Sequence, residues 1–283
     1  MIEKLSNSWN LVKASAQVLQ KDKELLIFPI FSAIGLLIVS ASFFLPVLFG
    51  NLLDSLFNNQ VGVFGYVFLF AFYLVQYLVI FFANTALVGA AQIRLRGGDP
   101  TVSDGFRIAF EHLGAIFGYA LIAATVGLIL KTISRKSNGI GRFIISLIGF
   151  TWNIATFLVV PILVAENIGP IKAIKRSVTL LKKTWGEQII GNFGLGAVFN
   201  LVYFVMILLG IGLGLVTSIV FESLYATIAV VVIFIILFAL VSLVNSALSG
   251  IYTAAVYEYA SSGQAGNFFN ENMVKNAFTP TSS

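Results

Sequence analysis

The sequence predicts an all-α fold: a polytopic helical membrane protein with six transmembrane helices and further amphipathic helices on the cytoplasmic side. The first observation is composition, because 58% of the 283 residues are hydrophobic and only 10% are charged, whereas about a quarter of a soluble globular chain is charged. The second is patterning, because six long stretches contain no Asp, Glu, Lys or Arg. Together they exclude a soluble enzyme and a nucleic-acid-binding domain, so no nucleic acid is expected among the partners.

Each charge-free stretch is long enough to cross a membrane, because a hydrocarbon core about 30 Å thick requires roughly 20 helical residues. A helix is required there, since it pairs its own backbone groups where no water is present. In order along the chain, the predicted spans are 25–49, 66–93, 113–130, 143–165, 189–215 and 225–257.

Lysine and arginine set the predicted orientation, because positively charged loops are retained on the cytoplasmic side. With the N-terminus inside, only four of the 17 basic residues fall in outer loops, all of them in 131–142. Making 113–130 re-entrant would keep that loop inside but would place the more basic segment 166–187 outside. We therefore predict a multi-pass protein with both termini cytoplasmic. A cleaved signal peptide is not expected, since the apolar run begins only after residue 24 and is long.

An amphipathic helix is predicted between the fourth and fifth spans. Its apolar residues recur at steps of three and four: Ile171, Ile174, Val178, Leu181 and Trp185. Its basic residues fall on the adjacent face: Lys172, Lys175, Arg176, Lys182 and Lys183. This pattern is typical of a helix at a membrane surface, so we expect the basic residues to contact anionic lipid headgroups. The alternative is a basic loop that only fixes the topology.

The N-terminal segment repeats this design. Its apolar stripe is Leu5, Trp9, Val12, Ala16 and Leu19. Asp22 and Glu24 follow it, and we expect them to pair with basic residues of the second amphipathic helix, because opposite charges lie at the same depth there.

Two short segments indicate an internal duplication. Residues 84–89 read Asn-Thr-Ala-Leu-Val-Gly, and residues 245–250 read Asn-Ser-Ala-Leu-Ser-Gly. The amphipathic helices align at nearly the same offset. We therefore predict a single transmembrane domain over 1–283, in which the similar segments face each other near the inner leaflet. Its parts are repeat-like units 1–93 and 166–254 of the parallel kind, an inserted helical hairpin 113–165 and a cytoplasmic tail 258–283.

The residues that membrane enzymes and ion-coupled transporters need are scarce. The chain has no Cys, a single His at position 112, no Asp within a predicted span and no phosphate-binding Gly-rich motif. Three carboxylates, Glu166, Glu222 and Glu258, lie at predicted span ends, where interfacial residues are common. We therefore expect no catalytic residues, no cofactor and no metal site.

The predicted spans do contain neutral polar residues and glycines. Four asparagines, Asn84, Asn153, Asn200 and Asn245, are candidates for a polar path, or for a seam of hydrogen bonds between helices. Glycine-rich faces, such as Gly210 with Gly212 and Gly214, indicate close helix packing and favour a homo-oligomer.

Several segments together resemble a known family. They include KDKELLIFP at 21–29, GGDPT at 97–101, the stretch from Pro161 to Pro170, TWGE at 184–187 and the ending 269–280. They resemble a bacterial family of six-span membrane proteins that is known only as a domain of unknown function. The layout around Pro161 and Trp185 is similar, more distantly, to YciC-like proteins and to the membrane domain of some glycerophosphodiester phosphodiesterases. The resemblance implies a bacterial inner membrane and supplies no catalytic residues.

The expected function is non-catalytic: a lipid-interacting, self-associating scaffold in the inner membrane. Its expected partners are membrane lipids with anionic headgroups, further copies of the chain and a membrane protein. The alternative is a transporter or channel for a lipid or small solute, with a path between the two repeats.

Overall fold

The computed structural model describes residues 2–49, 63–185 and 195–275. Within these residues every element is helical, which confirms the predicted all-α fold class. The elements are α1 (Ile2–Lys21), η1 (Lys23–Leu26), α2 (Ile27–Phe49), α4 (Val63–Leu95), α5 (Val102–Glu111), α6 (Leu113–Lys136), α7 (Gly139–Thr156), α8 (Val159–Glu166), α9 (Pro170–Trp185), α10 (Gly196–Leu215), η3 (Val216–Val220), α11 (Leu224–Ser262) and α12 (Glu271–Lys275).

Six segments of the described chain are long and apolar enough to span a membrane, as predicted. They are Lys23–Leu45, Gly65–Leu95, Leu113–Arg135, Gly139–Glu166, Val198–Val220 and Leu224–Ser262. The last helix continues past the predicted end at residue 257, and it ends where Gly263 adopts a φ of +81°. The predicted tail 258–283 therefore begins inside α11. Residues 189–194 of the fifth predicted span and residues 276–283 of the tail lie outside the described residues.

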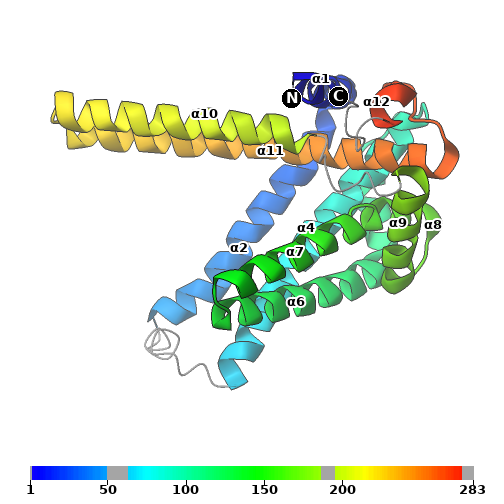
Figure 1. Ribbon diagram of the computed structural model, residues 1–283, viewed down its shortest axis with the longest axis horizontal. Helices are drawn as coiled ribbons and strands as arrows, with labels where there is room; N and C mark the ends of the chain where they lie inside the picture. Colours follow the sequence, from blue (N-terminus) through cyan, green and yellow to red (C-terminus); the bar gives the residue numbers. More distant parts are fainter. Residues whose placement is uncertain (1, 50–62, 186–194, 276–283) are drawn as a thin grey trace.

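The helices form a packed head from which two arms diverge (Figure 1). We define the head as α1, η1, α5, α8, α9 and α12 with the adjoining ends of α4 and α11. The bundle arm consists of α2, α4, α6 and α7. The hairpin arm consists of α10, η3 and the first half of α11, residues 224–244.

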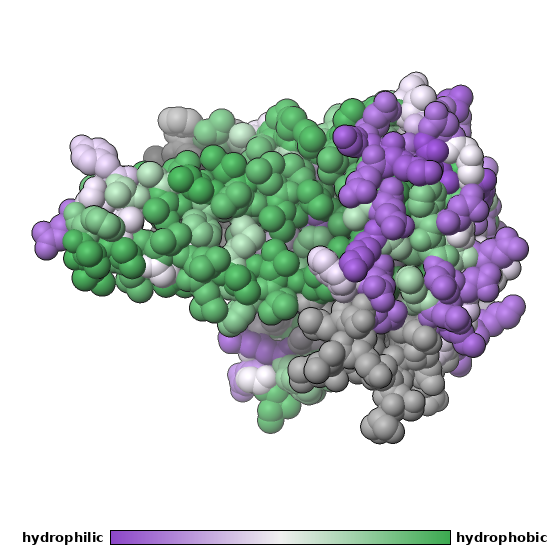
Figure 2. All heavy atoms as spheres, turned by 90° about the horizontal axis from the view of Figure 1, so that it is seen from above, coloured by the Kyte–Doolittle hydropathy of each residue, from purple (hydrophilic) through white to green (hydrophobic). Residues whose placement is uncertain are grey.

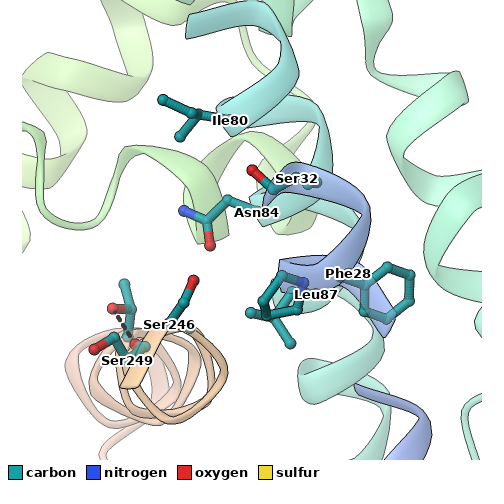
Figure 3. A pocket seen from close by; sticks show the side chains of 11 residues that line it. Phe28, Ser32, Ile80, Asn84, Leu87, Ser246 and Ser249 are labelled. Atoms are coloured by element: carbon teal, nitrogen blue, oxygen red, sulfur yellow. Dashed lines mark hydrogen bonds between the residues drawn. The ribbon is translucent and has the colours of Figure 1, made fainter. Parts of the chain in front are cut away.

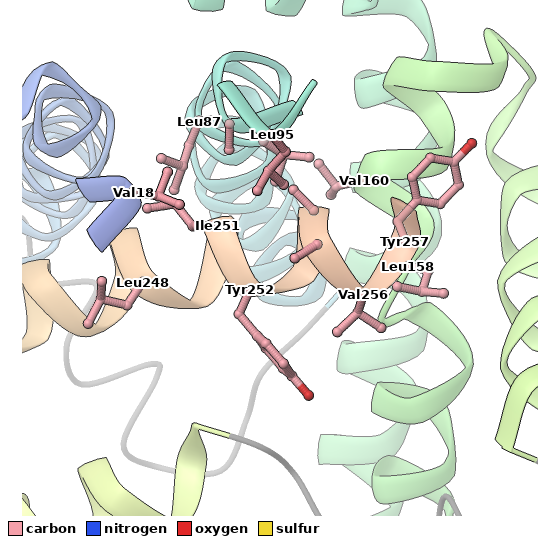
Figure 4. Close-up of a cluster of buried hydrophobic side chains, with 14 of the residues drawn as sticks. Val18, Leu87, Leu95, Leu158, Val160, Leu248, Ile251, Tyr252, Val256 and Tyr257 are labelled. Atoms are coloured by element: carbon pink, nitrogen blue, oxygen red, sulfur yellow. The ribbon is translucent and has the colours of Figure 1, made fainter. Parts of the chain in front are cut away.

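Apolar side chains from most helices of the head meet in one core. Leu11 of α1, Ile162 of α8 and Ile251 of α11 are completely buried, and Leu87 of α4 is only 2% exposed. The second half of α11 runs through this core, with Ile251 on the side of α4 and Tyr252 on the opposite side (Figure 4). This helix therefore belongs to the head at one end and to the hairpin arm at the other.

The arms expose apolar side chains. Leu37 of α2 is 71% exposed, and Ile235 of α11 is 62% exposed. Seen from above, polar side chains gather over the head, whereas apolar side chains cover the hairpin arm (Figure 2). In water such surfaces would be unstable, but hydrocarbon is the solvent that suits them.

The fourth span is not one continuous helix over 143–165. It is broken between α7 and α8, because Pro161 has no N–H to offer the carbonyl four residues earlier. The N–H of Leu158, which also loses its helical partner there, donates to the Ser177 hydroxyl of α9 at 3.2 Å. The break is thus stabilised by a helix of the head.

The helix α5 is fixed at its start by a capping box. The Asp104 N–H donates to the Thr101 hydroxyl at 3.2 Å, and the Thr101 N–H donates to the Asp104 carboxylate at 3.0 Å. The Thr101 hydroxyl also donates to the Asp104 carboxylate at 2.7 Å. This hydrogen bond, followed by that from the Thr101 N–H and a smaller contribution from Arg107, holds the pKa of the Asp104 carboxyl below its usual range. The helix packs on Phe28, whose ring meets that of Phe106 edge-on with centroids 5.3 Å apart.

The helices near the chain termini and the basic loop 131–142 lie at opposite ends of the molecule. The helices nearest the termini, α1 and α12, contact each other in the head. The connection between α6 and α7 lies at the far end of the bundle arm (Figure 1), so the basic loop 131–142 is opposite the termini. That the head faces the cytoplasm stays a prediction.

The two repeat-like units, 1–93 and 166–254, contain elements in the same order: an amphipathic helix followed by two spans. Their surroundings differ, because α1 packs on α10 and α11, whereas α9 packs on α6, α7 and α8. A common origin of the two units stays a prediction.

Candidate functional site

A pocket lies where α2, α4 and α11 meet, at the point from which the two arms diverge (Figure 3). Its volume is about 200 Å³. Five polar residues line it: Ser32 of α2, Asn84 of α4, and Ser246, Ser249 and Thr253 of α11. We call this the junction pocket.

The floor of the junction pocket is apolar and close-packed. Phe28, Leu87 and Gly250 line it and are buried. A Cβ at position 250 would lie 2.4 Å from Leu87 Cδ2 and 3.5 Å from Asn84 Oδ1. Only glycine therefore allows α11 to approach α4 this closely. The segments 84–89 and 245–250, which are similar in sequence, thus contact each other as expected.

Three polar side chains of the junction pocket point toward a common space. In Figure 3 the amide of Asn84 lies between the hydroxyl groups of Ser32 and Ser246. Within the described part of the chain, none of these three side chains has a hydrogen-bond partner. All three are partly or fully exposed, so a ligand can reach them. An amide and two hydroxyl groups offer both donors and acceptors.

The other two polar side chains of the junction pocket form hydrogen bonds within α11. Ser249 Oγ donates to Asn245 Oδ1 at 3.3 Å, and Thr253 Oγ1 donates to the Ser249 carbonyl at 2.7 Å. The lining contains no Asp, Glu, Lys or Arg. The pocket is therefore polar and uncharged.

The four asparagines named from the sequence are not gathered in one place. Asn84 lines the junction pocket. Asn245 lies beside it, but its amide donates to the Tyr203 hydroxyl of α10 at 3.3 Å and so joins the two helices of the hairpin. Asn153 of α7 and Asn200 of α10 are exposed, on different arms. Asn245 thus acts in a seam between helices, and Asn84 in a pocket.

Sequence reasoning missed Ser32 and Thr253. A signal existed for α11, because Ser246, Ser249 and Thr253 follow at steps of three and four and so share one helical face. Ser32 carried no comparable signal. Its place opposite Asn84 depends on the register of α2 against α4, which a single sequence does not specify.

The apolar stripe predicted for α9 to face the membrane is partly buried within the protein, at Leu181 and Trp185. The buried residues of α9 are Ala173, Ser177, Leu180, Leu181 and Trp185. Ile171 is 62% exposed and Val178 is 44% exposed, so part of the predicted stripe faces outward. The reason is that α9 packs on the protein helices α6, α7 and α8 as well as on α11. Apolar periodicity does not distinguish such neighbours from lipid.

The five basic residues of α9 divide into two groups. Arg176 pairs with Glu166, with Nε 2.9 Å from Oε1. Lys172, Lys175, Lys182 and Lys183 are exposed, and they form no salt bridge with any described residue. The four lysines therefore remain the candidates for contact with anionic headgroups.

Asp22 does not pair with α9, contrary to expectation. Its carboxylate accepts hydrogen bonds from Arg94 Nε and Nη2 at the end of α4. Arg96, two residues after Arg94, pairs with Glu258 of α11, with Nη2 2.7 Å from Oε1. Arg94 and Arg96 lie closer to these carboxylates because the end of α4 runs through the middle of the head. Ion pairs thus join α4 to the start of the first span and to α11.

A protein-family model matches most of the chain. The family described as "Family of unknown function (DUF6159)" matches residues 63–268. No curated protein and no solved structure matches the chain. The match agrees with the resemblance to a family of unknown function, and nothing in the comparisons supports the likeness to YciC-like proteins or to phosphodiesterase membrane domains.

Proposed function

Because the chain belongs to the family DUF6159, whose function is unknown, we propose a function from its own geometry. It is a non-catalytic protein of the bacterial inner membrane, a scaffold that contacts lipids along both arms and anionic headgroups at its head.

The observation that carries this proposal is the division of the surface. Apolar side chains are exposed along both arms, including Leu37 and Ile38 of α2 and Ile233 and Ile236 of α11. Polar side chains gather at the head (Figure 2). The hairpin arm diverges from the bundle arm, so lipid can contact apolar side chains of both. A chain of this shape presents far more lipid-exposed surface than a closed bundle of the same helices.

The exposed lysines of α9 are the basis of the proposed preference of the head for anionic lipids. Each lysine near an anionic membrane surface contributes roughly 1 kcal/mol of attraction. Lys172, Lys175, Lys182 and Lys183 are free of salt bridges within the described structure, whereas Arg176 is neutralised by Glu166. The two exposed apolar residues of α9, Ile171 and Val178, lie on the same helix and suit the boundary between headgroups and acyl chains.

Self-association through the hairpin arm is part of the proposal. The space beside Gly210 of α10 is already filled by α11, because a Cβ at this position would lie 3.1 Å from Phe234. Gly212 and Gly214 meet no atom within 4 Å. Gly212 is exposed on the side of α10 opposite to Gly210, and the backbone of another helix can approach closely there.

Native mass spectrometry of the full chain released from nanodiscs tests lipid preference and protomer number together. The nanodiscs contain phosphatidylethanolamine and phosphatidylglycerol with identical acyl chains. We expect retained lipid to be enriched in phosphatidylglycerol, and the combined change of Lys172, Lys175, Lys182 and Lys183 to Gln to lower this enrichment several-fold.

A matched control removes positive charge at the other end of the molecule. Changing Lys131, Arg135 and Arg142 to Gln affects the far end of the bundle arm, so the enrichment at the head should persist. Equal retention of both lipids by the unmodified chain would contradict the proposed preference, and a strictly monomeric release would contradict self-association.

A second candidate function is passage of a lipid or small solute, and the junction pocket favours it. The pocket supplies a polar site between the arms, although Asn153 and Asn200 lie away from it. Changing Asn84 to Leu should abolish transport by a carrier and should leave a scaffold intact. Flux of a fluorescent lipid between the leaflets of proteoliposomes separates the two functions.

A further inference from the structure

We infer that the junction pocket binds the hydroxyl and ester groups of an uncharged glycerolipid of the diacylglycerol class. This inference rests on the proposed lipid-contacting function and specifies the lipid chemistry of one site. The evidence is the set of three unpartnered polar side chains, the absence of charge in the lining, the depth of the pocket and the apolar surfaces beside it.

The polar side chains match the groups of such a lipid. Asn84 offers two N–H donors and a carbonyl acceptor, and the Ser32 and Ser246 hydroxyl groups each donate and accept. Their oxygen and nitrogen atoms face one space in Figure 3. A free hydroxyl with neighbouring ester carbonyl groups can satisfy all three side chains at once. In hydrocarbon, where water is absent, these polar groups are costly without such a partner.

The absence of charge excludes a phosphate from the pocket. Moving an ionised group out of water costs several kcal/mol unless an opposite charge compensates it. None of the lining residues is charged. A phospholipid could therefore place its headgroup here only at a high cost, whereas the smaller cost of burying uncharged hydroxyl and ester groups is offset by hydrogen bonds to the three side chains.

The depth of the pocket also favours an uncharged lipid over a phospholipid. Asn84 precedes Arg94 on α4 by ten residues, and Ser249 precedes Glu258 on α11 by nine. At 1.5 Å per helical residue, Asn84 and Ser249 lie roughly 14–15 Å along their helices from these charged side chains of the head. A polar group held at this depth must belong to a molecule that enters the hydrocarbon region readily. Diacylglycerol does so because it lacks a charged headgroup.

The pocket is large enough for the polar end of the lipid but too small to enclose its acyl chains as well. About 200 Å³ is several times the share of liquid volume of one water, roughly 30 Å³, and it is below the range of about 300–1,000 Å³ for sites that enclose a drug-sized ligand. The polar end fits inside. The acyl chains then lie along the exposed apolar surfaces of the two arms, which diverge from the pocket.

The test uses the full-length protein in detergent micelles with dioleoylglycerol and dioleoylphosphatidylglycerol as probes, read by native mass spectrometry. We expect dioleoylglycerol to bind at one site per chain. Asn84→Leu should weaken this binding about 5–10-fold, the loss expected for neutral hydrogen bonds. Ser246→Ala should weaken it about 3–5-fold. Asn153→Leu makes the same change at an exposed position and should leave the affinity unchanged.

Three outcomes would overturn the inference. They are no saturable binding of dioleoylglycerol, equal weakening by Asn153→Leu, and binding of dioleoylphosphatidylglycerol that is equally tight and equally sensitive to Asn84→Leu. Because Ser246 is exposed, Ser246→Ala is expected to fold even if Asn84→Leu does not. Retention of phosphatidylglycerol that depends on the α9 lysines would show that the proposed scaffold function stands while the inference fails; loss of both would overturn both.

Discussion

Arg94 and Asp22 form a two-pronged ion pair between the end of α4 and the residue that precedes the first span. Both Nε and Nη2 of Arg94 donate to the carboxylate, and the two side chains are only 16% and 7% exposed. A guanidinium and a carboxylate match in this geometry, so the pair fixes orientation as well as distance. It joins α2, through η1, to the helix that runs along the centre of the head.

Removing the Asp22 carboxylate should destabilise the protein. Asp22→Asn leaves Arg94 partly buried with only the exposed Asp99 as a charged partner, so we expect a loss of about 2–3 kcal/mol. Thermal unfolding in detergent checks this loss. Asp99→Asn is the control, because that side chain is 91% exposed, and it should cost less than about 1 kcal/mol. Equal losses in the two variants would contradict the assignment.

The contact between α4 and α11 should depend on the absence of a side chain at position 250. Gly250→Ala places a Cβ 2.4 Å from Leu87 Cδ2, so Leu87 must move, and we expect a loss of about 1–3 kcal/mol. In a Leu87→Ala background this additional loss should vanish, because the obstructing atoms are gone. Gly114→Ala, which meets open space, should change stability by less than about 0.5 kcal/mol. A similar loss at both glycines would argue for a general effect of glycine replacement.

The broken fourth span should depend on a hydroxyl group of α9. Ser177→Ala removes the acceptor of the Leu158 N–H, and a buried donor without a partner costs about 1–2 kcal/mol. Hydrogen exchange at Leu158 should become faster than in the unmodified chain. Thr179→Ala is the control on the same helix, since its hydroxyl only donates to the carbonyl of Lys175 within α9. Unchanged exchange at Leu158 would show that the cap contributes nothing.

The capping box of α5 should produce a dependence on acidic pH. The folded-state pKa of Asp104 lies below the unfolded value of about 3.8, so its stabilising contribution is complete above that value. The contribution is lost as the pH falls through the lower, folded pKa. Thr101→Val removes the hydroxyl hydrogen bond and should move the pKa of Asp104 back up toward 3.8. NMR titration of the Asp104 side-chain carbon measures this shift, and an unaltered titration would refute the role given to Thr101.

The arrangement of the ends can be tested cleanly because the chain contains no cysteine. Asn138→Cys lies between α6 and α7 at the far end of the bundle arm, and Gln264→Cys lies in the head between α11 and α12; both positions are exposed. A membrane-impermeant maleimide applied to intact cells should label only position 138. Membrane disruption should then expose position 264. Labelling of both positions from one side would contradict six spans with the head inside.

The spans were predictable because hydrocarbon imposes one simple condition. Every crossing must be a helix that satisfies its own backbone hydrogen bonds and exposes apolar side chains to lipid. Such helices are visible in the sequence as long stretches without charge. Pro161 carried a sign of the break between α7 and α8, but its position alone does not exclude a kinked continuous helix. What repairs the break, Ser177, comes from another element, and nothing near Pro161 in the sequence indicates it.

The packing of the head was not predictable from periodicity. The apolar stripe was expected to face the membrane, but Leu181 and Trp185 of that stripe are buried within the protein together with Ala173, Ser177 and Leu180. Small side chains contribute little to a hydrophobic pattern, yet they permit close helix contacts and are therefore buried. Likewise, Asn84 could be named as a polar residue within a span, whereas its neighbour across the pocket, Ser32, depends on a contact between helices that are far apart in sequence.

The helix α11 is one continuous rod of 39 residues with two different surroundings. Its first half, including Val231 and Ile235, exposes apolar side chains on the hairpin arm, whereas its second half, including Ile251 and Ala255, is enclosed by α1, α4 and α8. One unbroken helix thus connects the apolar surface of the hairpin arm to the packed interior of the head, so the two regions are mechanically continuous.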